Sequence, residues 1–412
     1  MAIQFSPPDL TEHEIEKVVE VLRSGWITTG PKTKELEDRI AAYCGTPRCV
    51  CLSSATAAME LTLRLMGIGP GDEVITSTYT YTASASVAAH VGARVILVDT
   101  GKDSFEMDYE QLAEAITEKT KAIIPVDIGG VMADYRRVIS IAQQRKSMFR
   151  PTHPLQEALG RVLVLADAAH SFGAISEGVP SGALADFTCF SLHAVKNLTT
   201  AEGGAITWRP DFPAESDDLY RQFMLLSLHG QSMDALEKAK LGAWAYDISL
   251  LGYKCNMTDI AAALGLGQLD RYEHLLARRR AIIERYDRGL ANAAISPLLH
   301  YGPDFASSGH LYIVRLLGRT EAFRNRVIKR LAAQGIPTNV HYKPLPLFTA
   351  YQQLGYSIHD YPNAFRQYEN ALSLPCHTKL SDEDVDQIVA GLIAAIQQEA
   401  EVSTWNQTSG KS

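Results

Sequence analysis

Residues 162–171 read VLVLADAAHS, and residues 186–197 read DFTCFSLHAVKN. Each segment contains a short apolar run typical of a buried strand, and polar residues follow where that strand should end. Asp167 closes the first run, whereas Lys196 lies a few residues beyond the second. Open α/β sheets bind ligands at the carboxyl ends of their strands, so we expect these two side chains at one edge of a sheet.

Short β-branched runs and helical patterns alternate around this pair, from about residue 50 to residue 208. Such alternation is typical of an α/β fold, in which helices cover both faces of a mostly parallel sheet. Helices are predicted over 57–66 and 109–116. Strands are predicted over 50–53, 73–76, 94–99, 121–126, 161–166, 187–191 and 204–208.

The pattern changes after the last of these strands. A long helical pattern rich in arginine covers 268–291, a strand is predicted over 311–316, and helices are predicted over 321–334 and 382–400. These elements indicate a smaller C-terminal α+β domain. We therefore predict a large α/β domain over 1–270 with an N-terminal helical segment, a small domain over 271–401, and a flexible tail over 402–412.

The composition narrows the possible functions. The 412 residues are 46% hydrophobic and 21% charged, which is typical of a globular chain. A formal net charge of -8 provides no broad cationic surface, so we do not expect nucleic-acid binding as the main activity. The six cysteines follow no disulfide or metal-ligand spacing, and we interpret them as reduced core thiols. No signal-peptide pattern or apolar run of about 18 residues is found, which predicts a cytoplasmic protein that does not bind membranes.

Residues 143–160 interrupt the alternation with a basic segment that contains two prolines. Its most direct interpretation is a solvated surface loop. A role in binding substrate phosphates or a partner protein is the less favoured alternative.

Asp167 and Lys196 together suit pyridoxal 5′-phosphate (PLP). The lysine amine would form a Schiff base with the PLP aldehyde, and the carboxylate would keep the pyridine nitrogen protonated by charge pairing. Taken singly, such an aspartate could cap a helix and such a lysine could be a solvated surface group. Their position after successive strands, followed by a Glu-Gly-Gly sequence at 202–204, favours the cofactor site.

The PLP phosphate needs its own binding site, and residues 50–59, VCLSSATAAM, predict a strand that leads into a helix. Backbone N–H groups at Ala55, Thr56 and Ala57 would face an anion at the helix N-terminus, assisted by the Thr56 hydroxyl. Ser191 supplies another hydroxyl at the same sheet edge. Ordinary helix capping is the alternative interpretation of this segment.

Three rings follow predicted strands. Tyr79 and Tyr81 come after the strand at 73–76, and a ring face against the cofactor would exclude water and fix its tilt. For Tyr79 we favour a position in the core. His170 would either hydrogen-bond the phenolic oxygen of the cofactor or be a satisfied buried histidine.

Taken together, these segments resemble the DegT family of PLP-dependent nucleotide-sugar aminotransferases, which share the aspartate aminotransferase fold (fold type I). The resemblance covers nearly the whole chain, and the combination of motifs is specific although each motif alone is weak. The matching segments are SGWITTGP at 24–31, SSATA at 53–57, GDEVI at 71–75, DAAH at 167–170, SLHAVKN at 191–197, AEGG at 201–204 and GYKCNMTD at 252–259.

The resemblance implies a role for each matching residue. Lys196 would bond covalently to PLP, Asp167 would pair with the pyridine nitrogen, and His170 would contact the phenolic oxygen. The ring that stacks on the cofactor would be Tyr81, and its phosphate would be held by Ala55, Thr56 and Ser191. Asn256 would reach the cofactor phosphate of a neighbouring subunit, which implies a homodimer with shared sites.

The resemblance also implies an activity, the transfer of an amino group from L-glutamate to a nucleotide-linked ketosugar. The segments at 24–32 and 53–57 are most similar to sugar-4-aminotransferases, which favours amination at sugar position 4. His341 and Tyr342 would contact the sugar, although residues 339–344 match the family's pattern only loosely. Residues lining the entrance would be Trp26, Thr28 and Thr29.

Three alternatives stay open at this point. The first is a 3-ketosugar aminotransferase. The second is a sugar dehydratase, which in this family has histidine in place of the lysine; Lys196 argues against it because His193 lies three residues earlier. The third is a PLP-binding regulator without turnover.

Overall fold

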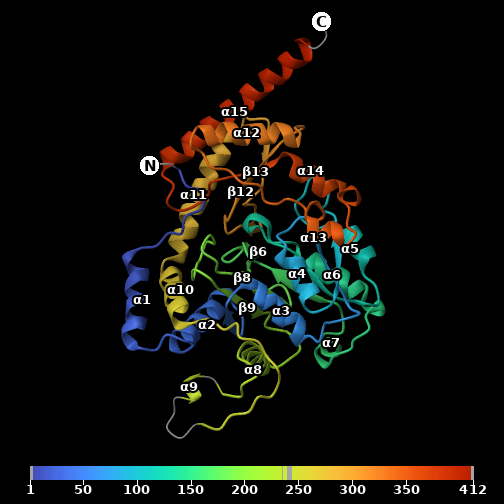
Figure 1. The fold of residues 1–412 in the computed structure, drawn as a ribbon, viewed down its shortest axis with the longest axis vertical. Coiled ribbons are helices and arrows are strands. Elements are labelled where there is room, and N and C mark those ends of the chain that lie inside the picture. Colours follow the sequence, from blue (N-terminus) through green and yellow to red (C-terminus); the bar gives the residue numbers. More distant parts are fainter. Residues whose placement is uncertain (1–2, 234, 239–243, 410–412) are drawn as a thin grey trace.

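A seven-stranded sheet forms the centre of the protein (Figure 1). The computed structural model describes residues 3–233, 235–238 and 244–409. In spatial order, the strands are β1 (Cys49–Leu52), β9 (Gly204–Trp208), β8 (Phe187–Ser191), β5 (Leu163–Asp167), β4 (Thr120–Ile124), β2 (Glu73–Ser77) and β3 (Arg94–Val98). Only β9 runs antiparallel to its neighbours, β1 and β8. The predicted mostly parallel α/β sheet is confirmed.

Helices cover both faces of this sheet because successive side chains of a strand point to opposite sides. Val74 of β2 packs into the apolar cluster on one face, and Ile75 packs into the cluster on the other. The first face is covered by α3 (Ala55–Leu65), α4 (Ala83–His90) and α8 (Ser216–Ser227). The second is covered by α2 (Pro31–Cys44), α5 (Tyr109–Ala115), α6 (Tyr135–Gln144) and α10 (Asp259–Asp270). Burial on both faces explains why the strands are continuous apolar runs.

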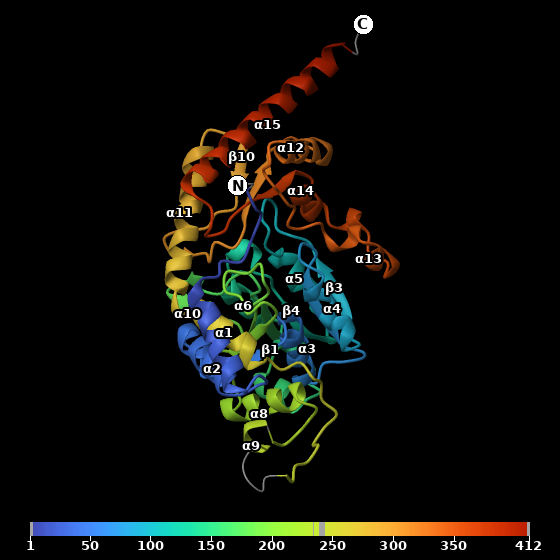
Figure 2. The same cartoon turned by 60° about the vertical axis from the view of Figure 1, so that its left-hand side comes forward.

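The C-terminal part has its own apolar cluster, formed by a three-stranded sheet and three helices. Its strands are β10 (Ile295–Pro297), β12 (Tyr312–Leu316) and β13 (Ala371–Leu374), and its helices are α11 (Tyr272–Leu290), α12 (Glu321–Ala333) and α15 (Asp382–Ser409). Figures 1 and 2 show this part above the large sheet in both views. The predicted domain limits, residue 270 between the two domains and residue 401 at the end of the small domain, stay predictions.

The remaining helices and strands connect these two parts or lie at their edges. The helices are α1 (Glu12–Ser24), α7 (Pro154–Leu159), α9 (Ala235–Lys238), α13 (Thr349–Gln353) and α14 (Pro362–Asn370), with 3-10 turns at Ile128–Gly130, Lys146–Met148, Leu345–Leu347 and Ile358–Asp360. The strands are β6 (Ile175–Ser176), β7 (Val179–Pro180) and β11 (Phe305–Ala306).

Two helix boundaries differ from expectation. The helical pattern predicted over 268–291 is confirmed over most of its length by α11, but the chain breaks at Arg271, whose φ of -119° and ψ of 15° leave the helical range, so residues 268–270 belong to α10. The backbone of α15 continues to Ser409, past the expected end at residue 400 and into the predicted flexible tail; residues 410–412 lie outside the described residues.

The interpretation of residues 143–160 as a solvated loop is also only partly correct. The segment includes α7, and both Phe149 and Gln156 are buried. The Gln156 amide donates to the carbonyl of Met66 at 2.8 Å, and Lys121 Nζ at the start of β4 donates to the carbonyl of Arg150 at 2.6 Å. These contacts place the segment at the amino edge of the sheet, which argues against a role beside Asp167.

Five of the six cysteines are buried and Cys255 is half-buried, and all six are free. The expectation of unpaired core thiols is therefore confirmed for five of them. Among the described residues, none of the helices combines the length and apolar character needed to span a bilayer.

A buried ion pair joins the amino ends of β5 and β8. The two nitrogens Nη1 and Nη2 of Arg161 each donate to one oxygen of Asp186 at 2.7 Å. The backbone N–H of Val164 donates to the same carboxylate at 2.8 Å, and Arg209 Nε lies 3.2 Å from it. Because the carboxylate is fully buried, these donors replace the water that it loses on folding.

We expect Arg161→Met to lower the free energy of unfolding by about 3 kcal/mol, because it leaves Asp186 as a buried charge with only one neighbouring cation. Urea unfolding of the cofactor-free protein measures this loss. The matched control is Arg150→Met, which removes an exposed ion pair with Glu118 and local hydrogen bonds to the carbonyls of Ser147 and Phe149, and should cost less than about 1 kcal/mol. Equal losses for the two variants would contradict the assignment.

Candidate active site

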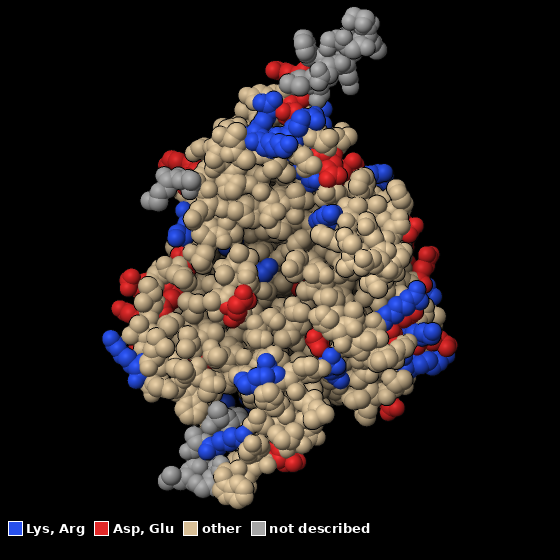
Figure 3. All heavy atoms as spheres, in the orientation of Figure 1, with Lys and Arg blue, Asp and Glu red and all other residues tan. Residues whose placement is uncertain are grey.

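A cavity of about 520 Å³ lies at the carboxyl edge of the large sheet, where the C-terminal part faces it. Figure 3 shows that the surface between these two parts is hollowed near its centre. Nine of the thirteen residues predicted for the site line this cavity: Ala55, Thr56, Tyr81, Asp167, His170, Ser191, Lys196, His341 and Tyr342. Strand ends of one part and loops of the other therefore build a single site.

Asp167 is the last residue of β5 and is buried. Its carboxylate accepts from the Ser84 hydroxyl at 2.6 Å and from the Ala169 backbone N–H at 3.2 Å. Burial raises the pKa of this carboxyl, whereas the two hydrogen bonds and the positive charge of Lys196 oppose the rise. A cationic group in the cavity could therefore pair with the Asp167 carboxylate, which has only these few other partners among the described residues.

Lys196 follows β8 in a loop and is partly exposed to the cavity. Burial lowers the pKa of its amine to about 8, against the attraction of Asp167. At pH 7 about a tenth of this amine is therefore neutral, and the neutral form is the one that can act as a nucleophile or a proton acceptor.

The first turn of α3 forms another wall of the cavity. Ser54 caps the helix by accepting from the Ala57 N–H at 3.0 Å, whereas the N–H groups of Ala55 and Thr56 have no acceptor within the described residues. A Cβ atom on Gly204 would lie 2.2 Å from the Ser54 carbonyl carbon, so only glycine lets β9 approach this turn. The free donors suit a phosphate.

His170 is held between the two parts of the protein. Its Nδ1 accepts from the backbone N–H of Gly129 at 3.3 Å, which assigns the proton to Nε2, and Nε2 lies 3.0 Å from the Tyr342 hydroxyl. Burial, followed by the nearby charges of Lys196 and His341, lowers its pKa well below the ordinary range. The ring is therefore neutral, with a defined tautomer.

Three residues that the sequence interpretation missed support this site. Asn197, next to Lys196, donates to the Ser308 carbonyl at 2.8 Å and lies 2.9 Å from His310 Nδ1. The His310 ring is 4.3 Å from the His170 ring, and Ser84 holds Asp167. Only the position of Asn197 beside Lys196 could have indicated such a role, because Ser84 and His310 are distant in the sequence.

The two tyrosines after β2 have different environments. Tyr79 is fully buried and donates to the His341 carbonyl at 2.8 Å, so its predicted position in the core is confirmed. Tyr81 lines the cavity, is 61% exposed and has its ring 6.2 Å from that of Tyr342. Its face is thus available to a ligand, and stacking on PLP stays a prediction.

Four predicted site residues do not line the cavity: Trp26, Thr28, Thr29 and Asn256. The Trp26 indole donates to the Thr29 carbonyl at 3.2 Å, and the Thr29 hydroxyl donates to the Met257 carbonyl at 2.5 Å. Asn256 Nδ2 donates to the Thr29 hydroxyl at 2.5 Å. Within one chain, therefore, this group lies outside the cavity, and the expectation that Trp26, Thr28 and Thr29 line its entrance is not met.

The residues present fit PLP. A buried carboxylate, a lysine with a lowered pKa, and a helix N-terminus with free N–H groups line the same cavity, which matches the ring nitrogen, aldehyde and phosphate of this cofactor.

Comparison with known proteins agrees with this chemistry. The sequence profile of the DegT/DnrJ/EryC1/StrS aminotransferase family matches residues 8–393. The spore coat polysaccharide biosynthesis protein SpsC of Bacillus subtilis is 36% identical over 393 residues, which cover 94% of this chain and 95% of that protein.

Solved structures give the same result. Spr1654 of Streptococcus pneumoniae, assigned as a sugar aminotransferase, superposes in its form with pyridoxamine phosphate with a TM-score of 0.94 and 53% identity, covering 96% of this chain and all of that one. A PLP form of the same protein gives 0.94 and 52%, over 97% of this chain and 100% of that chain. PseC of Helicobacter pylori, an aminotransferase involved in pseudoaminic acid biosynthesis, gives 0.84 and 26%, over 97% of this chain and 100% of that chain. The chain described here therefore belongs to the PLP-dependent DegT/DnrJ/EryC1/StrS aminotransferase family.

Proposed function

We propose that the protein transfers an amino group from L-glutamate to a nucleotide-linked ketosugar, at sugar position 4. The observation that carries the proposal is the cavity itself, which Lys196, Asp167 and the first turn of α3 line together. Similarity to sugar aminotransferases supports the sugar as acceptor. When bound, PLP would supply an electron sink that stabilises a carbanion at the substrate carbon.

Each protein residue has a defined task in this proposal. Lys196 would hold the cofactor covalently and, once released, would carry a proton between donor and acceptor atoms, because burial lowers the pKa of its amine to about 8. Asp167 would pair with the ring nitrogen, and its burial excludes water that would weaken the pairing. The neutral His170 ring, whose Nε2 lies 3.0 Å from the Tyr342 hydroxyl, would contact the phenolic oxygen of the cofactor.

The acceptor sugar would lie towards the C-terminal part. His341 lines the cavity there, and burial lowers its pKa to about 4, so the ring is a neutral hydrogen-bonding group. Its Nδ1 lies 2.9 Å from the Ser373 hydroxyl, which fixes the ring orientation. Tyr342 lies beside it, and the two side chains can bind sugar hydroxyl groups without a net charge.

The proposal includes a homodimer. The segment between α8 and α10, as far as its residues are described, extends from the body of the protein in both views of Figures 1 and 2. It exposes large apolar side chains, of which Trp244 is 83% and Leu251 96% exposed. Such side chains on one projecting segment are typical of a protein interface. Asn256 lies near the end of this segment and does not line its own cavity, which favours its predicted contact with the cofactor of a second subunit.

The first test follows the absorbance of bound cofactor. L-glutamate alone should bleach the visible absorbance of the protein as purified, and a UDP- or dTDP-linked 4-ketosugar should restore it. Lys196→Ala should reduce the rate of both steps by at least about 100-fold, because the proton carrier is lost. Recovery of the absorbance only with a 3-ketosugar would contradict amination at sugar position 4. Bleaching by glutamate without recovery by any nucleotide ketosugar would contradict nucleotide-linked ketosugars as the acceptor. If glutamate never changes the cofactor absorbance, the result would favour the alternative of a PLP-binding regulator without turnover.

A second test measures the Lys196 amine directly. In cofactor-free protein, labelling of Lys196 by trinitrobenzenesulfonate should reach half its maximal rate near pH 8, because only the neutral amine reacts and burial lowers its pKa to about 8. Below that pH the rate should fall about tenfold per unit. Peptide mapping identifies the labelled residue, and a midpoint near the ordinary lysine value of about 10.4 would contradict the proposed environment.

A third test concerns the dimer. The double variant Trp244→Ser, Leu251→Asp should shift the protein from dimer to monomer in light scattering, because it removes apolar contacts and introduces a buried charge. Leu299→Asp changes another exposed leucine outside this segment and should leave the mass unchanged. A monomeric wild type, or a dimer that resists the double variant, would be evidence against this interface.

A further inference from the structure

The first described residues form a strap, which we define as residues 3–9. The strap connects two parts of the protein: α1, which follows it, packs along α10, whereas Ile3 packs against the apolar cluster of the C-terminal part. His377 Nε2, also from the C-terminal part, lies 3.0 Å from the Gln4 carbonyl. In Figures 1 and 2 the described chain before α1 leads up to the start of α15, while α1 itself lies lower, beside α10.

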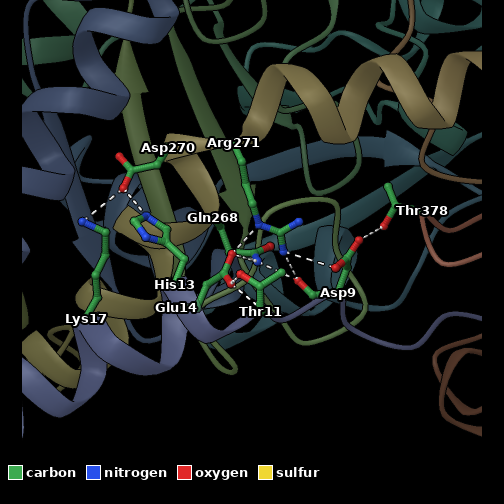
Figure 4. A network of polar contacts seen from close by, with 9 residues as sticks. All are labelled: Asp9, Thr11, His13, Glu14, Lys17, Gln268, Asp270, Arg271 and Thr378. Atoms are coloured by element: carbon green, nitrogen blue, oxygen red, sulfur yellow. Dashed lines mark hydrogen bonds and ion pairs between the residues drawn. The ribbon is translucent and has the colours of Figure 1, made fainter.

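One polar network fixes the C-terminal end of the strap (Figure 4). Arg271 Nη2 donates to the Asp9 carbonyl at 2.5 Å, and Arg271 Nε donates to Glu14 at 2.5 Å. Gln268 Nε2 donates to the Asp9 carbonyl at 2.8 Å and to Glu14 at 2.9 Å. The Thr378 hydroxyl donates to the Asp9 carboxylate, so the C-terminal part is tied in as well.

This network occupies the break between α10 and α11. Arg271 leaves the helical range there, and its guanidinium bonds to Glu14, which is fully buried. A buried carboxylate that loses its cationic partner is strongly destabilised, so the pairing with Glu14 fixes the guanidinium that also binds Asp9 at the end of the strap.

The strap places two side chains in the active-site cavity, Phe5 and Ser6. The Phe5 ring stacks on His341 with centroids 5.9 Å apart and planes at 21°. The Ser6 hydroxyl donates to the carbonyl of Val195 at 3.3 Å, immediately before Lys196. The strap therefore contacts His341, on the proposed sugar side of the cavity, and also the loop after β8 that carries Lys196, which we call the lysine loop.

We propose that the strap forms the acceptor-side wall of the active site, in which Phe5 is a specificity-determining residue and Arg271 is a positioning residue. This inference rests on the proposed function. Asp167 and the first turn of α3 account for the cofactor, whereas Phe5 and neutral His341 together offer an apolar, uncharged surface. Such a surface suits the C–H face of a sugar ring, which charged or purely polar groups would not bind.

The first variant to test is Phe5→Ala. It should raise KM for the nucleotide ketosugar that restores the cofactor absorbance by roughly 2- to 10-fold, the size of one aromatic contact. The rate of bleaching by glutamate should not change, since Phe5 lies on the acceptor side. Leu10→Ala, an exposed position just beyond the strap, is the matched control and should leave both measurements unchanged.

Arg271→Lys tests this network, because lysine keeps the charge but replaces the two separate nitrogens that reach Asp9 and Glu14 with a single one. Hydrogen exchange of the peptide covering the strap should accelerate at least tenfold, and KM for the ketosugar should rise as in Phe5→Ala. The control is Asp270→Asn, which weakens the neighbouring ion pairs to His13, Lys17 and Arg39 at the same helix junction but touches no strap residue (Figure 4). If Arg271→Lys does not fold, Thr378→Val is the substitute, because it removes only the hydrogen bond from Thr378 to Asp9.

The outcomes separate this inference from the proposed function. If wild-type protein responds to no nucleotide ketosugar, the function falls and the inference with it. If the wild type responds to a nucleotide ketosugar but Phe5→Ala has an unchanged KM for it, the proposed function stands and the role of Phe5 in the acceptor-side wall is wrong. Equal exchange rates of the strap in Arg271→Lys, Thr378→Val and Asp270→Asn would overturn the anchor.

Discussion

The bidentate ion pair between Arg161 and Asp186 constrains the whole active site. It joins the amino ends of β5 and β8 inside the protein, where a lone carboxylate would be strongly unfavourable. The two strands are then paired in parallel, with Asp167 opposite Cys189, two residues before Ser191. A shift of one residue in this pairing would turn the side chains to the opposite face of the sheet. The pair at one end therefore fixes the chemistry at the other.

The same burial that organises the sheet edge also adjusts its ionisable groups, and it acts on acid and base in opposite directions. It raises the pKa of Asp167 and lowers that of Lys196, and it keeps His170 and His341 neutral. Burial thus leaves the two imidazoles of the cavity uncharged and brings the titration of the Lys196 amine closer to neutral pH. Such opposed shifts in one cavity are typical of catalytic sites.

The C-terminal part completes the site from the other side. Asn197 and His310 connect the lysine loop to it, and Tyr342 contacts His170. The strap adds a third connection, because its anchor at Arg271 lies where α10 ends and α11 begins. Three separate segments of the chain, far apart in sequence, therefore define the space left for a substrate.

The sequence by itself determined the parallel sheet and its strands, because burial on both faces gives continuous apolar runs that are visible without a structure. It also predicted Asp167, Lys196, and the first turn of α3, since these side chains follow directly from strand ends. Only the tertiary structure decided the break at Arg271, the packing of residues 143–160, the position of Trp26 outside the cavity, and the contacts of Phe5, Ser84 and His310. Each of those depends on contacts between residues distant along the chain, which local periodicity does not encode.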